Sequence, residues 1–72
     1  MKTKYKIKVR WADGKIEDYE LVYDKKADDW IIRKPGFFGA TFVTRVTSTN
    51  LKEIEDALES AVGKAVKQVK LI

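Results

Sequence analysis

The sequence predicts an α+β domain, in which a four-stranded antiparallel sheet made of two hairpins packs on one helix near the C-terminus. Apolar and charged residues alternate strictly over residues 4–11, and a second alternating run covers 16–23, which is the period of a half-buried strand. Two runs rich in β-branched and aromatic residues follow at 30–34 and 41–47. Residues 51–62 carry an apolar stripe with helical spacing. Covering one face of such a sheet with a helix is a standard α+β arrangement, and it leaves the other face for binding.

Composition limits the protein to one small domain spanning residues 1–72, because a chain of this length has apolar material for a single core. The hydrophobic content of 44% is sufficient for that core and argues against disorder. The chain has no cysteine, so disulfides and thiolate metal sites are excluded. The sequence has no long apolar run, so we expect neither a signal peptide nor a membrane-spanning helix. We therefore expect a cytoplasmic protein without membrane partners.

Charge determines the expected register of the first hairpin. A two-residue turn at Asp13–Gly14 would mix apolar and charged residues on both faces, and a slip of one residue moves every side chain to the other face. A three-residue loop over 12–14, with Gly14 left-handed, is a common hairpin connection. This loop pairs like with like on one face and opposite charges on the other: Ile7 with Tyr19, Tyr5 with Leu21, Lys8 with Asp18, and Lys6 with Glu20.

The second hairpin is expected to turn within residues 35–39, where Pro35 and Gly36 favour a turn. Phe37 and Phe38 are adjacent, and adjacent strand residues point to opposite faces. We therefore expect one of these two rings to fill the core beneath the turn and the other to be exposed at the tip.

The helix is expected to begin after Asn50, a favourable N-cap, with Glu53 reaching back to it as in a capping box. Gly63 is a natural stop. The expected buried stripe contains Leu51, Ile54, Leu58 and Val62, widened by Ala57 and Ala61. Residues 64–72 fit either a continued helix or a fifth, C-terminal strand, and their β-branched content favours the strand.

Catalysis is not expected. The chain has no histidine, the usual general base near neutral pH and the commonest metal ligand. Its carboxylates cluster at Asp28–Asp29 and over 53–59, where they fit a solvated loop and a solvated helix face. We expect no enzyme activity, no cofactor and no metal site.

Two features carry the candidate binding site. The outward face of residues 4–10 is basic, although Asp18 and Glu20 are expected to neutralise its middle and leave Lys2, Lys4 and Arg10 free. The loop near residues 33–39 places basic residues beside aromatic ones. Trp11 and Trp30 are assigned to the core. The candidate binding residues are Lys4, Lys6, Lys8, Arg10, Arg33, Lys34, Phe37, Phe38 and Arg45.

These features support two hypotheses about the partner. The leading one is a nucleic-acid-binding module, because the net charge is +4, the pI is about 9.4, and cations beside exposed rings can bind phosphates and bases. The second is a protein-interaction module, acting as an inhibitor, an adaptor or one subunit of a homodimer. It would use the Phe37–Phe38 loop or an open sheet edge.

Overall fold

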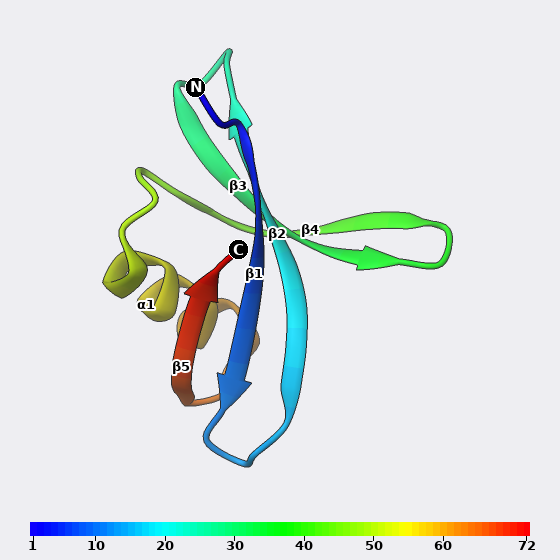
Figure 1. Ribbon diagram of the computed structural model, residues 1–72, viewed down its shortest axis with the longest axis vertical. Coiled ribbons are helices and arrows are strands. Elements are labelled where there is room, and N and C mark those ends of the chain that lie inside the picture. Colours follow the sequence, from blue (N-terminus) through cyan, green and yellow to red (C-terminus); the bar gives the residue numbers. More distant parts are fainter.

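A computed structural model describes residues 1–72 as one antiparallel sheet with a single helix (Figure 1). The sheet has five strands in the order β4-β3-β2-β1-β5. The predicted α+β class and the fifth strand are therefore confirmed. The elements are β1 (Lys4–Trp11), β2 (Ile16–Asp24), β3 (Asp29–Gly36), β4 (Gly39–Val46), α1 (Leu51–Val62) and β5 (Val66–Leu71).

The first hairpin has the predicted register. Ile7 pairs with Tyr19 and Lys8 with Asp18, in an antiparallel ladder that runs without a bulge. The backbone N–H of Trp11 donates to the carbonyl of Lys15 at 2.9 Å, so the loop that this pair closes is residues 12–14. Gly14 has a φ of 92°, in the left-handed region that favours glycine. Period two, the placement of the charges and one glycine were therefore enough to determine this register.

The tail forms a strand because the helix is stopped by its C-cap. Gly63 is left-handed, with a φ of 77°, and its N–H donates to the carbonyl of Glu59. The chain then turns back, and β5 pairs antiparallel with β1, so that Val69 lies beside Val9. Continuing the helix past Gly63 would have left this side of β1 without a hydrogen-bonded neighbour.

The start of the helix follows one prediction and departs from another. The Asn50 side chain accepts hydrogen bonds from the backbone N–H groups of Lys52 and Glu53, at 2.9 and 3.1 Å, so the N-cap is confirmed. Glu53 does not reach back to Asn50. Its carboxylate accepts from the backbone N–H of Thr47 at 2.7 Å and from the Ser48 hydroxyl at 2.8 Å. These donors and the Thr47 hydroxyl bind the carboxylate together and lower the pKa of Glu53, so the capping box is replaced by a brace on the β4–α1 loop.

The core lies between α1 and one face of the sheet, which we call the covered face. From the helix, only Ile54 and Leu58 are fully buried. Leu51 and Val62 remain partly exposed and Ala61 is exposed, so the buried stripe is narrower than predicted. The reason is that α1 contacts β4 and β5, at opposite edges of the sheet, and only its middle lies over the shared core. The whole buried cluster is Ile7, Val9, Trp11, Tyr19, Leu21, Trp30, Ile32, Val46, Ile54, Leu58 and Val69.

The second hairpin extends past the body of the protein as an arm, made of residues 33–42 (Figure 1). Gly36 pairs with Gly39, so the turn is the two residues Phe37 and Phe38, and both strands are longer than predicted. A Cβ on Gly36 would lie 2.9 Å from the carbonyl oxygen of Gly39, so the pairing next to the turn requires glycine at this position. A register shift after Ile32 separates the arm from the core part of the hairpin.

The narrow buried stripe leads to a prediction about stability. Leu58→Ala removes a fully buried side chain and is expected to lower the free energy of unfolding by about 2–5 kcal/mol. Leu51→Ala makes the same chemical change at a position that is 45% exposed, and it should cost within about 1 kcal/mol. Urea unfolding of both variants measures the difference. Equal losses would contradict the placement of the helix.

Candidate binding surfaces

The sheet face opposite the helix, which we call the open face, carries a network of ion pairs. Lys4 Nζ lies 3.1 Å from a carboxylate oxygen of Glu20, and Lys6 Nζ lies 3.3 Å from one of Asp18. Glu20 also accepts from Nε of Arg33 at 2.7 Å. Each lysine therefore bonds an acid that lies diagonally across the ladder, two residues from the β2 residue directly opposite it, which is within reach for a long side chain.

This diagonal pairing corrects the expected list of free cations. Lys4, expected to be free, is paired with Glu20 because the residue directly across from it is the apolar Val22. Lys8, expected to be neutralised by Asp18, makes no ion pair because Asp18 bonds Lys6 instead. The neutralised part of the strand is thus shifted by two residues toward the N-terminus.

The three basic residues around the second hairpin are all ion-paired, and they lie on both faces of the sheet. Arg33 lies on the open face and bonds Glu20. Lys34 lies on the same face as the helix, in the part of the sheet that the helix does not reach. Its Nζ is 3.1 Å from a carboxylate oxygen of Glu17 and 4.5 Å from the centre of the Tyr19 ring. The third, Arg45, contacts Asp24 at 3.0 Å and Asp29 at 2.7 Å. The predicted aromatic and basic loop therefore does not present unpaired cations beside its rings.

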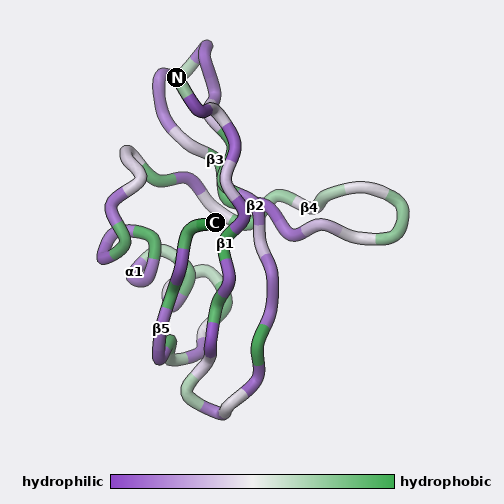
Figure 2. The backbone as a smooth tube through the Cα atoms, viewed as in Figure 1, coloured by the Kyte–Doolittle hydropathy of each residue, from purple (hydrophilic) through white to green (hydrophobic).

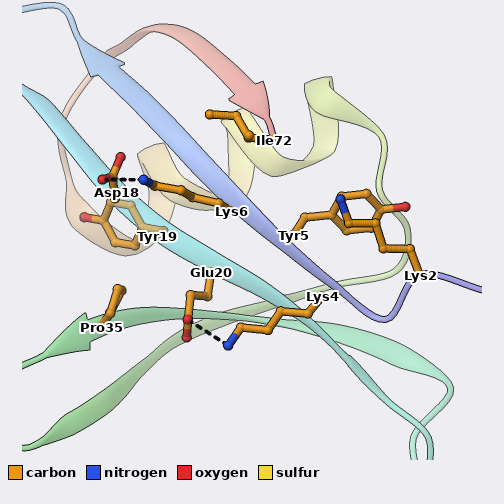
Figure 3. Close-up of a pocket in the computed structure, with 9 residues that line it drawn as sticks. All are labelled: Lys2, Lys4, Tyr5, Lys6, Asp18, Tyr19, Glu20, Pro35 and Ile72. Atoms are coloured by element: carbon orange, nitrogen blue, oxygen red, sulfur yellow. Dashed lines mark ion pairs between the residues drawn. The ribbon is translucent and has the colours of Figure 1, made fainter.

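The largest hollow, of about 360 Å³, lies along β1 and β2 (Figure 3). Its lining residues are Lys2, Lys4, Tyr5, Lys6, Asp18, Tyr19, Glu20, Pro35 and Ile72. Both of its carboxylates are held by lysines, as the dashed lines in Figure 3 mark. Hydrogen bonds from Arg33 and Lys4 lower the pKa of Glu20, so this carboxylate is poorly matched to acid–base chemistry near neutral pH.

The turn of the arm exposes both of its aromatic rings. Phe37 is 95% exposed and Phe38 97%, and the ring centres lie 4.9 Å apart at an interplanar angle of 80°. Figure 2 shows this turn as a hydrophobic segment at the far end of the arm. The expectation that one ring fills the core is wrong, because both residues belong to the turn, which lies beyond the sheet's packed region. We call these two residues the phenylalanine tip.

Sequence reasoning missed Phe42, which is 59% exposed on the same arm. Alternation alone would place it on the same face as Thr44, which pairs with the buried Ile32. The register shift changes this, and Phe42 instead pairs with Arg33 of the open face. The bulge had no clear signal in the sequence, because the run 41–47 is uniformly rich in β-branched residues.

A second feature missed by sequence reasoning is a basic cluster at the edge of the open face, formed by Lys8, Arg10 and Lys70. None of the three makes an ion pair. Lys8 pairs directly with Lys70 across β1 and β5, and Arg10 pairs with Gln68. Finding this cluster required the pairing of β5 with β1, which the sequence pattern left undetermined.

No three histidine, cysteine, aspartate or glutamate side chains gather in a metal-binding group. The helix α1 is neither long enough nor apolar enough to cross a membrane. Comparison with known proteins finds no matching family model, no matching curated protein and no matching solved structure.

The ion pairs of Glu20 predict how stability depends on acidity. Its pKa in the folded protein lies below the ordinary value of 4.5, because it accepts hydrogen bonds from Arg33 and Lys4. The stability it contributes is complete above that ordinary value and is lost as the pH falls through the lower, folded value. Urea midpoints measured from about pH 6 down to about pH 2 should therefore fall less steeply for Glu20→Gln than for the wild type. The same slope in both proteins would show that these contacts do not form in solution.

Proposed function

We propose that this protein is a non-catalytic binding module that docks on a partner protein through the phenylalanine tip of the β3–β4 arm. The observation that carries the proposal is that two adjacent phenylalanine rings are almost completely exposed at the end of a projecting hairpin. The cytoplasmic location expected from the cysteine-free composition is part of the same proposal.

The tip has the properties of a binding anchor and no packing role in its own domain. A buried phenylalanine removes roughly 150–250 Å² of apolar surface from water, and large aromatic side chains dominate interface energies. In the isolated domain the two rings contact each other in an edge-to-face pair, so neither fills the core. Contiguous exposed apolar surface of this kind typically marks an interaction site.

The charges near the arm favour an apolar partner site over an acidic one. The arm's own cations, Arg33 and Lys34, are already bonded to Glu20 and Glu17. They would form the rim of an interface, where charge affects the association rate and specificity more than affinity. We therefore expect a partner with an apolar cleft, and binding that tolerates salt.

The test compares the proteins captured from lysate by the wild type with those captured by the double variant Phe37→Ser/Phe38→Ser. The variant should fold, because both rings lie outside the core, and it should lose the captured protein. Nuclease treatment and added salt should leave wild-type capture unchanged. Sedimentation of the purified domain over a range of concentrations shows whether the partner is a second copy of the chain.

Ile16→Ser is the matched control for this test, since Ile16 is a 53% exposed apolar residue on β2, outside the arm. It should capture the partner as the wild type does. Equal capture by the wild type and the double variant, or equal loss with Ile16→Ser, would reject docking through the tip.

A second candidate function is nucleic-acid binding, and the excess of cations on the open face favours it. The carboxylates of that face are Asp18, Glu20, Asp24 and Asp29, and its cations are Lys4, Lys6, Lys8, Arg10, Arg33, Arg45 and Lys70. Such an excess attracts phosphate backbones, and exposed rings can stack on bases.

Fluorescence anisotropy with labelled DNA and RNA oligonucleotides tests this candidate. At about 50 mM salt, binding should be measurable and should weaken steeply as salt is added, because each neutralised phosphate releases counterions. No binding at that salt concentration would eliminate the candidate and leave docking through the tip untouched.

A further inference from the structure

We infer that Lys8, Arg10, Gln68 and Lys70 form a binding site for a phosphate group at the edge of the open face. All four side chains come from the paired strands β1 and β5. Together with Ile16 they line a separate small hollow of about 60 Å³. The site does not rest on docking through the phenylalanine tip, and it would supply a phosphate contact if the nucleic-acid candidate holds.

The first observation that supports this site is a pair of like charges that lowers the stability of the isolated domain. Lys8 and Lys70 lie directly across from each other on adjacent strands, and like charges in this position are destabilising. Asp18 lies across from Lys8 on the other side but bonds Lys6. The repulsion between the two lysines is therefore not relieved within the chain.

The other cations of β1, β3 and β4 provide a contrast with this edge. The cations Lys4, Lys6, Arg33, Lys34 and Arg45 each have a carboxylate partner at 3.3 Å or less. Only at the β1–β5 edge do three cations gather around a hollow with no carboxylate in its lining. An anion from outside the chain would complete at this edge the charge pairing found in β3, in β4 and in the N-terminal half of β1.

The donor set fits a phosphate group. The guanidinium of Arg10 presents a planar fork of N–H donors that matches phosphate oxygens, and lysine ammonium groups act as point charges around it. The side-chain amide of Gln68 adds neutral N–H donors beside Arg10. A phosphate carries more charge than a carboxylate and has more acceptor oxygens, so it can contact several of these donors together.

The test follows backbone amide chemical shifts by NMR as inorganic phosphate is added, with chloride at matched ionic strength as the reference. Amides of β1 and β5 around the hollow should shift and saturate. Lys70→Gln and Arg10→Gln should each weaken phosphate binding by about tenfold, the effect of losing one charge-assisted hydrogen bond. Lys67→Gln is the matched control, because it removes the same charge from the same strand outside the hollow, and it should bind as the wild type does.

A second readout follows from the repulsion between the lysines. Without phosphate, Lys70→Gln should unfold at a higher temperature than Lys67→Gln, because only the former removes the cross-strand pair of like charges. Added phosphate should reduce this difference. Full phosphate affinity in either Lys70→Gln or Arg10→Gln, or equal weakening by Lys67→Gln, would overturn the proposed site.

A parallel titration with a short oligothymidylate identifies the source of the phosphate. If it saturates the same amides, the site takes phosphodiesters as well as free phosphate. If inorganic phosphate saturates these amides and the oligonucleotide does not bind anywhere on the protein, the ligand is a small phosphate compound and the nucleic-acid candidate fails. Oligonucleotide binding that is insensitive to Lys70→Gln and Arg10→Gln would keep the nucleic-acid candidate and reject this site as its phosphate contact.

Discussion

Burial of one face of β1 beneath α1 is the constraint on which the other features of this domain depend. Ile7, Val9 and Trp11 are all completely buried, and β1 is hydrogen-bonded to β2 on one side and to β5 on the other. Because strand side chains alternate between faces, burying these three residues forces the intervening lysines and arginine outward. The basic open face is therefore a direct consequence of how the core is built.

The two neighbours of β1 then divide that basic face into unlike halves. On one side, β2 offers Asp18 and Glu20, which reach the lysines diagonally and neutralise the N-terminal part of the strand. On the other side, β5 offers Gln68 and Lys70, which add donors and positive charge but no carboxylate. On the β2 side, the cations are thus paired with carboxylates of the chain itself. On the β5 side, the cations have no such partner, and we propose that an anion binds there.

The opposite edge of the sheet presents the apolar surface. The pair β3–β4 continues beyond the region that α1 covers, so residues 35–42 have no core to pack on and all are exposed. Tight pairing of Gly36 with Gly39 places Phe37 and Phe38 at the extreme end of the arm. The phenylalanine tip and the basic cluster therefore belong to opposite edges of one sheet, and separate substitutions can test them independently.

The sequence by itself determined the features that depend on local chemistry. Alternation, the placement of the charges and Gly14 specified the first hairpin and its register, and Asn50 and Gly63 specified both ends of the helix. Tertiary structure decided the features that depend on neighbours distant in sequence. These are the diagonal ion pairs, the hydrogen bonds of Glu53 to the β4–α1 loop, the exposure of both tip rings and the cross-strand pairing of Lys8 with Lys70. The physical reason is that hydrophobic periodicity and helix capping depend on residues a few positions apart. The ion pairs of long side chains depend instead on which groups the folded sheet brings within reach.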